Sequence, residues 1–192
     1  MKFGDLRPMF HQCPNLKTPA EIRDDESVQA FVSAAESFQC ALESRPNDRQ
    51  EWVAALTQSL ARLYAAGTAL PDVDIETAQD VPDGFDVDDA EWLRLYTHVS
   101  DGLGNRCGYW ACFDPTELLE PQEPVFGHLG DDLGDIYRDV IPGLRAWQDG
   151  EDSYVAAIVF GWKHPLFGCH WGVHAVSALR VLHELAYNRG VD

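Results

Sequence analysis

Two histidines stand one helical turn apart in the stretch HWGVHAVSALRVLH, residues 170–183. Neutral imidazoles at positions i and i+4 of a helix share a face and can bind one zinc or iron ion, with a third ligand from another segment. This spacing makes His170 and His174 candidate metal ligands. The zincin motif HExxH is absent, because Trp171 occupies the position of its glutamate. The alternative is that both histidines are hydrogen-bonded packing residues beside an apolar helix face.

A second cluster consists of carboxylates in the stretch HLGDDLGDIYRDV, residues 128–140. Asp132, Asp135 and Asp139 are spaced i, i+3 and i+7, which places them on one stripe of a helix. Like charges at this spacing destabilise a helix unless a cation, an arginine or a histidine compensates them. Their oxygens suit magnesium or manganese. The alternative is an exposed helix face with ordinary ion pairs.

The two clusters together resemble metal sites in helical bundles, which take their ligands from facing helices. This hypothesis requires that residues 129–141 and 168–188 form helices whose polar edges lie next to each other. A divalent cation is then the expected cofactor. Aromatic and basic residues near the same motifs are candidates for a binding pocket: Trp110, Tyr137, Arg138, Trp171 and Arg180.

Helical periodicity predicts the elements that must position these residues. The first predicted helix follows Asp24 or Asp25 as its N-cap and carries its apolar side chains at Val28, Phe31, Val32, Ala35, Phe38 and Leu42. A second helix over residues 46–67 ends at Gly67 as its C-terminal cap. The short loop between them predicts an αα-hairpin.

Three further helices are expected along the chain. One begins after Asp88 or Asp89 and ends near Gly102, and the next begins near Gly130 and is kinked or ended by Pro142. The last helix contains the histidine motif, and its apolar face includes Trp171. Because Gly172 has no side chain, a neighbouring helix or loop is expected to approach this helix closely there. The apolar residues 152–162 fit a buried helix or a strand.

These elements predict an all-α fold, namely a single-domain bundle of five or six helices. Residues 1–24 are expected to be an irregular N-terminal segment, and residues 25–190 the helical domain. The acidic stretch 71–91 predicts a solvated connector. Prolines between residues 114 and 127 predict a second, proline-rich connector without long regular structure.

Composition narrows the classes of function. The 192-residue chain has a formal net charge of -18, so binding to nucleic acid or to an anionic membrane surface is disfavoured. Its five cysteines are scattered and include no CxxC pair, which favours reduced thiols in the cytoplasm over a disulfide framework. The first residues lack the apolar core of a secretion signal. A protein partner is compatible with this surface, and the oligomeric state is left open.

Three stretches carry a resemblance to a known family: GYWACFDP at 108–115, EPVFGHLGDDLGDIYRDVIPGL at 123–144, and HWGVHAVSALRVLH. In combination they resemble an uncharacterised bacterial all-helical family, domain of unknown function 5063. The resemblance implies an all-helical domain over about residues 26–186. It implies no reaction, ligand or partner.

Three hypotheses for the function follow. The first is a small, acidic, cytoplasmic binding or adaptor protein that recognises another protein through an aromatic groove or its acidic face. The second is a metal-dependent hydrolase of a phosphorylated small molecule, in which the aspartates hold the cation and His170 or His174 is a ligand or general base. The third is an acidic mimic of nucleic acid that inhibits a basic protein.

Overall fold

The computed structural model describes residues 17–44, 48–76, 78–112 and 123–187. Within these ranges the chain forms six α-helices of nine or more residues, two shorter α-helices and one two-stranded sheet. The predicted all-α class and the predicted number of long helices are therefore confirmed. None of the described helices is long and apolar enough to span a membrane.

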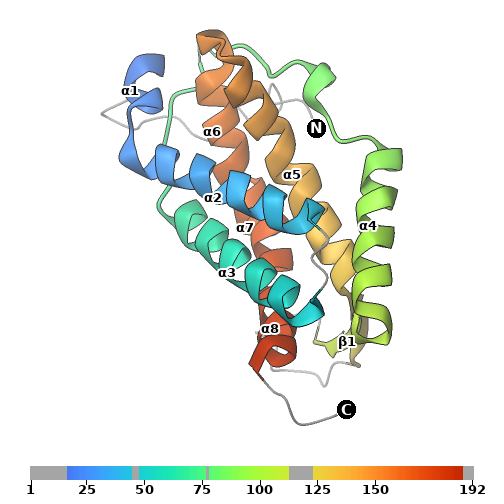
Figure 1. Cartoon of the computed structure of the whole chain (residues 1–192). Coiled ribbons are helices and arrows are strands. Elements are labelled where there is room, and N and C mark those ends of the chain that lie inside the picture. Colours follow the sequence, from blue (N-terminus) through green and yellow to red (C-terminus); the bar gives the residue numbers. More distant parts are fainter. Residues whose placement is uncertain (1–16, 45–47, 77, 113–122, 188–192) are drawn as a thin grey trace.

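The first part of the chain is a pair of packed helices. After the short helix α1 (Pro19–Arg23), helix α2 (Glu26–Glu43) begins at the N-cap Asp25, and α3 (Arg49–Thr68) lies beside it (Figure 1). Asp25 accepts hydrogen bonds from two backbone amides of the first turn of α2, which satisfies groups that the helix itself leaves unpaired. The predicted αα-hairpin is confirmed.

Helix α1 lies within the segment that was expected to be irregular. Residues 1–16 of that segment are outside the described residues, and the predicted domain boundary between residues 24 and 25 stays a prediction. The acidic connector that follows α3 contains no α-helix in its described residues before Asp89, where helix α4 (Asp89–Leu103) begins, and most of its acidic side chains are exposed. Ile75 and Val87 are buried and attach it to the core.

Helix α5 (Leu129–Asp149) is the central element, because it packs against α2, α4 (Asp89–Leu103), α6 (Val155–Lys163) and α8 (Trp171–Tyr187). The sequence predicted that Pro142 kinks or ends this helix, and the helix does not end there. It continues for two more turns to Gly150, whose φ of 86° is one that residues with a β-carbon rarely adopt.

Helix α6 resolves the ambiguity of residues 152–162. A 3-10 turn (Asp152–Tyr154) leads into α6, and eight of the nine residues of α6 are buried. A helix that is covered on all sides has no polar face, so its sequence shows no helical period. Helix α7 (Leu166–Cys169) then leads directly into α8.

Gly67 is not a C-terminal cap, which corrects the prediction from the sequence. It lies inside α3, which ends one residue later, and a β-carbon on it would approach the ring of Trp171 to 2.5 Å. The glycine is therefore needed for close packing of α3 against the start of α8. The expected close approach at Gly172 is confirmed, because a β-carbon there would lie 2.1 Å from the backbone oxygen of Phe167.

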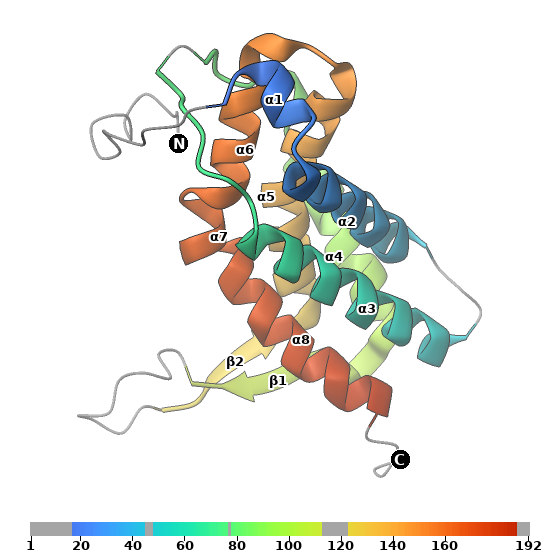
Figure 2. The same cartoon turned by 90° about the vertical axis from the view of Figure 1, so that its left-hand side faces the viewer.

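A short β-hairpin was not predicted. Strands β1 (Gly108–Ala111) and β2 (Val125–His128) pair antiparallel, with Tyr109 opposite Gly127 and Trp110 opposite Phe126. The hairpin lies at the end of the molecule where α5 begins, beside α8 (Figure 2). Residues 113–122, most of the predicted proline-rich connector, are outside the described residues.

Candidate metal centre

Helices α5 and α8 pack against each other and bring the two predicted clusters together. The Nδ1 atom of His174 lies 2.8 Å from Oδ1 of Asp132, and Nδ1 of His170 lies 2.6 Å from Oδ2 of Asp139. Two imidazole–carboxylate hydrogen bonds therefore connect α5 with the start of α8. The polar edges of the two helices face each other, as the hypothesis of a shared site required.

The helix expected over residues 168–188 is interrupted at His170, which stands in the turn between α7 and α8, immediately before α8. Its carbonyl oxygen accepts hydrogen bonds from the backbone N–H groups of Val173 (3.0 Å) and His174 (3.1 Å), so it starts the first turn of the helix. The imidazole rings of His170 and His174 lie 4.9 Å apart and meet edge to face. One helical turn thus presents both rings to α5.

Asp132 is the most enclosed member of the cluster, with 5% of its surface exposed. Its Oδ2 accepts a hydrogen bond of 2.6 Å from the hydroxyl of Tyr109 on β1, while Oδ1 accepts the bond from His174. Burial and the contact with Asp132 raise the pKa of Tyr109, and the Ser177 side chain opposes this rise. A buried carboxylate is tolerated when its oxygens are hydrogen-bonded in this way.

Asp135 has one oxygen engaged and one directed at the histidines. Its Oδ1 accepts a hydrogen bond of 2.9 Å from the indole Nε1 of Trp92 on α4, and its Oδ2 lies 3.7 Å from Nε2 of His174. One ligand atom from each of Asp135, His170 and His174 lies within 4.8 Å of the other two. Because both Nδ1 atoms are hydrogen-bonded to carboxylates, Nε2 is the nitrogen of each ring that can bind a metal ion.

Burial and the crowding of carboxylates shift the proton equilibria of the cluster. Burial raises the pKa of Asp139, against the opposing effect of its hydrogen bond from His170. Burial also raises the pKa of Asp131, and the charges of Asp135 and Asp132 raise it further. The hydrogen bond to Asp132 raises the pKa of His174. The raised pKa values of the two carboxyl groups reflect buried and crowded negative charge, which a bound cation would compensate.

The five residues predicted as a binding pocket do not form one pocket. Tyr137 and Trp171 are core residues, with exposed fractions of 1% and 0%. Arg138 donates to Asp89 (2.9 Å) and lies over the ring of Trp92. Only Trp110 and Arg180 are both exposed and connected, through a 2.9 Å hydrogen bond from the guanidinium to the Trp110 carbonyl oxygen.

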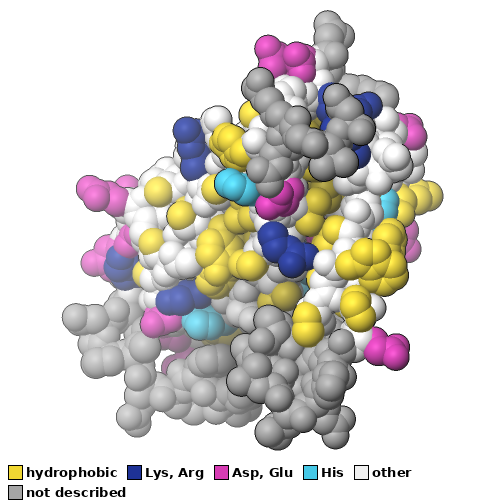
Figure 3. All heavy atoms as spheres, turned by 90° about the horizontal axis from the view of Figure 1, so that it is seen from below, with side chains coloured by type: hydrophobic (Ala, Val, Ile, Leu, Met, Phe, Trp, Pro, Cys, Tyr) yellow, Lys and Arg dark blue, Asp and Glu magenta, His cyan; other side chains and the backbone are white. Residues whose placement is uncertain are grey.

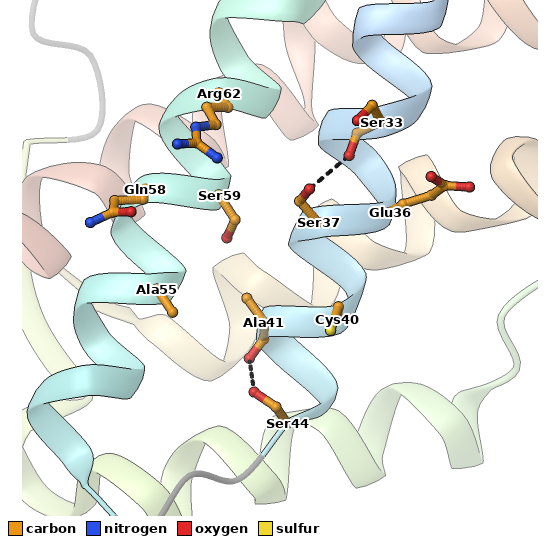
Figure 4. Close-up of a pocket in the computed structure, with 10 residues that line it drawn as sticks. All are labelled: Ser33, Glu36, Ser37, Cys40, Ala41, Ser44, Ala55, Gln58, Ser59 and Arg62. Atoms are coloured by element: carbon orange, nitrogen blue, oxygen red, sulfur yellow. Dashed lines mark hydrogen bonds between the residues drawn. The ribbon is translucent and has the colours of Figure 1, made fainter.

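A groove of ≈ 570 Å³ lies elsewhere, between α2 and α3 (Figure 4). Small and polar side chains line it: Ser33, Glu36, Ser37, Cys40, Ala41, Ser44, Ala55, Gln58, Ser59 and Arg62. None of them belongs to the histidine–aspartate cluster. Several of its hydroxyls are satisfied within their own helices, as Figure 4 shows for Ser37 and Ser44.

Sequence reasoning missed two residues of the cluster, Tyr109 and Trp92. Tyr109 reaches Asp132 from a strand of only four residues, which is too short to give a readable alternation. Trp92 fits the apolar pattern of its helix, but a largely covered indole N–H normally needs a hydrogen-bond acceptor. That requirement was the available signal.

The fold has a counterpart among solved structures. The crystal structure of protein BF1032 from Bacteroides fragilis superimposes with a TM-score of 0.72 at 22% sequence identity, over 89% of this chain and 99% of that one. At this identity the similarity establishes the fold alone. The search of curated proteins gives no match. Residues 23–188 match the family described as a domain of unknown function (DUF5063), as the three motifs indicated, and the chain belongs to this family.

Proposed function

We propose that Asp135, His170 and His174 bind a divalent transition-metal ion, and that the protein is a metal-dependent hydrolase. The observation that carries the proposal is the convergence of three ligand atoms within 4.8 Å of one another, at the interface of two packed helices. Neighbouring ligands of a tetrahedrally bound ion are about 3.4 Å apart, given metal–ligand distances of about 2.1 Å. Small side-chain rotations are therefore enough to close the site.

The hydrogen bonds around the three residues support a metal centre over a simple ion-pair network. Each proposed ligand is held by a partner that does not itself ligate: Asp139 holds His170, Asp132 holds His174, and Trp92 holds Asp135. Metal-binding histidines usually donate their second ring N–H to a carboxylate, which fixes the tautomer and the orientation of the ring.

The set of ligands favours particular ions and an open coordination sphere. Two imidazoles and one carboxylate suit Zn²⁺ or Fe²⁺ better than Mg²⁺, which prefers oxygen ligands. Three protein ligands leave at least one position for water, as in catalytic rather than structural metal sites. A metal ion in such a site lowers the pKa of its bound water toward neutrality.

Asp131 is suited to accept the proton of that water. It is exposed at the edge of the cluster, it interacts electrostatically with Asp135 and His174, and its pKa is raised. In the proposed hydrolysis, water loses one proton to a carboxylate and its oxygen bonds to the carbonyl carbon or phosphorus of an ester. The bond to the leaving alcohol then breaks as the alcohol takes up a proton. The phosphorylated substrate expected from the sequence stays a prediction.

The proposal is tested by titrating the metal-free protein with Zn²⁺ in a calorimeter. We expect wild type to bind a single ion, and His174→Ala and Asp135→Asn to lose most of this affinity. The matched control is His183→Ala, an exposed histidine on the same helix outside the cluster. At a concentration of 100 times Kd the ion stabilises the fold by about 2.7 kcal/mol, which raises Tm by about 5–10 °C.

Catalysis is tested separately with p-nitrophenyl phosphate and p-nitrophenyl acetate as probes. We expect turnover of at least one probe that requires added metal and disappears in Asp135→Asn. Absence of Zn²⁺ binding by wild type contradicts the metal centre. Metal binding without metal-dependent turnover of either probe contradicts the hydrolase assignment and leaves the metal centre in place.

A binding or adaptor function is the second candidate, and exposed apolar side chains support it. Trp110 and Phe126 on the hairpin are 66% and 63% exposed, and their rings pack edge to face at 5.5 Å. Hydrophobic side chains gather with Lys and Arg side chains on the face seen from below (Figure 3). For this function, Trp110→Ala must abolish capture of a protein partner without changing the affinity for Zn²⁺. Inhibition of a basic protein by the acidic surface remains the third proposal.

A cytoplasmic location is part of the proposal. Cys40, Cys107 and Cys169 form no disulfide, which agrees with a reducing compartment.

A further inference from the structure

We propose that the β-hairpin controls the metal affinity of the cluster, with Tyr109 as the positioning residue for His174. This inference rests on the proposed metal centre and extends it to an element that contributes no ligand. It is carried by two hydrogen bonds to one carboxylate: Tyr109 donates to Oδ2 of Asp132, and His174 donates to its Oδ1. The Ser177 side chain also interacts with Tyr109 and opposes the rise in its pKa.

The position of the Tyr109 ring is fixed by the hairpin itself. Gly127 lies opposite Tyr109 in the register, and a β-carbon at Gly127 would meet the ring at 2.4 Å and the hydroxyl oxygen at 2.7 Å. The ring therefore lies across β2 at the one residue that leaves room for it. From there the hydroxyl reaches Asp132 at 2.6 Å on the first turn of α5.

This contact decides which oxygen of Asp132 is available to the histidine. With Oδ2 occupied by Tyr109, Oδ1 is left for Nδ1 of His174 at 2.8 Å. The opposite edge of the imidazole then directs Nε2 toward Asp135, at 3.7 Å from its Oδ2. Without the tyrosine hydroxyl, the carboxylate has one fewer constraint on its rotation, and the imidazole loses part of its fixed orientation.

The hairpin is in turn tied to the helices that form the cluster. Arg180 on α8 donates to the Trp110 carbonyl oxygen (2.9 Å), and the His128 side chain accepts from the Gly130 amide at the start of α5 (3.1 Å). The His128 ring also stacks on Tyr96 of α4 at 4.8 Å. A displacement of the hairpin therefore moves Tyr109 relative to α4, α5 and α8 together.

The alternation of side chains along β1 supplies a matched control. Tyr109 faces the cluster, whereas the neighbouring Trp110 side chain lies on the other face of the strand and is exposed. Tyr109→Phe removes a single oxygen atom from the inner face, and Trp110→Ala removes a large side chain from the outer face. Only the first change is expected to affect the metal.

The test measures Zn²⁺ dissociation constants by chelator competition and the visible absorption spectrum of the Co²⁺-substituted protein. Removal of the direct hydrogen-bond partner of a metal ligand commonly weakens metal binding about 10–100-fold. Tyr109 acts on His174 only through Asp132, so we expect Tyr109→Phe to lose affinity at the lower end of this range, about tenfold. Ser177→Ala is expected to give a smaller loss in the same direction. Trp110→Ala is expected to stay within about twofold of wild type. The Co²⁺ spectrum, which reports coordination geometry, should change in Tyr109→Phe and not in Trp110→Ala.

The outcomes separate this inference from the proposed function. If Tyr109→Phe binds Zn²⁺ within twofold of wild type while His174→Ala loses it, the control by the hairpin is refuted and the metal centre stands. If Trp110→Ala weakens binding as much as Tyr109→Phe, the effect is a general disturbance of the hairpin and the positioning role is refuted. If wild type binds no Zn²⁺, both proposals fail.

Discussion

Asp132→Asn is the substitution that most directly probes the buried polar network. Both partners of Asp132 are donors: the Tyr109 hydroxyl and the protonated Nδ1 of His174. A carboxylate offers two acceptor oxygens, whereas an asparagine offers one acceptor oxygen and one NH₂ donor. One of the two partners must then face a donor. The change preserves the volume of the side chain, so it isolates the polar contribution from packing.

The expected loss of stability follows from these contacts. Losing one hydrogen bond to a charged group costs about 1.5–3 kcal/mol, and a donor left facing another donor inside the protein adds to this. Because His174 is about one quarter exposed, water relieves part of the penalty on its side. The expected decrease in the free energy of unfolding is therefore about 2–4 kcal/mol. Asp101→Asn, an exposed change on α4, should remain within about 0.5 kcal/mol of wild type.

The pH dependence gives a second readout in the same assay, urea unfolding of the metal-free protein followed by tryptophan fluorescence. The pKa of His174 is raised above 6.5 by its hydrogen bond to Asp132. A raised pKa in the folded state stabilises the protein fully below pH 6.5, and this contribution is lost as the pH rises through the folded-state value. The deficit of Asp132→Asn should therefore be larger at pH 6 than at pH 9. A deficit that equals that of Asp101→Asn, or that grows with pH, refutes the assigned network.

Two further predictions concern packing and burial. Gly67→Ala should lower the free energy of unfolding by about 1–2 kcal/mol, because its β-carbon would approach the Trp171 ring to 2.5 Å and the cost of overpacking exceeds the gain in helix propensity. Gly84→Ala, with no atom within 4 Å of its β-carbon, should be neutral in the same denaturation experiment. Burial raises the pKa of Cys107 to about 11, so at pH 8 a thiol reagent should modify exposed Cys169 in the folded protein and leave Cys107 unmodified until urea is added.

The sequence predicted those features that depend on local chemistry. The N-caps Asp25 and Asp88 were each one of two predicted candidates, because a carboxylate just before a helical pattern of apolar residues can accept hydrogen bonds from the first amides of the helix. The pairing of the clusters was also predictable in part. The histidine pair and the aspartate stripe each border an apolar helix face. Apolar faces of helices in one small domain pack together, so the polar residues beside them can meet.

The features that were missed depend on contacts between distant segments. Glycine is common at the C-terminal end of a helix, but the role of Gly67 is set by its contact with Trp171, which follows 104 residues later in the chain. The strands β1 and β2 are held by pairing with each other rather than by their own alternation. For α6, complete burial removed the periodic signal itself.

Two glycines of α5 affect both the packing of the helices and the geometry of the candidate metal centre. Gly130 and Gly134 are poor helix formers, and their presence in the first turns of the central helix conflicts with local propensity. The structure supplies the reason: a β-carbon at Gly134 would lie 2.8 Å from Nε1 of Trp92, and one at Gly130 would lie 3.0 Å from the Tyr96 carbonyl oxygen. The missing β-carbon at Gly134 lets α4 approach α5 closely enough for the indole to reach Asp135.

A substitution at Gly134 therefore tests separately the role of this glycine in helix packing and its role in the position of Asp135. Gly134→Ala gains helix propensity, about 1 kcal/mol, but it displaces an indole whose N–H holds Oδ1 of Asp135. If that hydrogen bond fixes the carboxylate for a cation, Gly134→Ala weakens metal binding by more than it changes the stability of the metal-free protein. A metal affinity that falls no more than the stability of the metal-free protein would show that Gly134 serves the packing of α4 on α5 and not the position of Asp135.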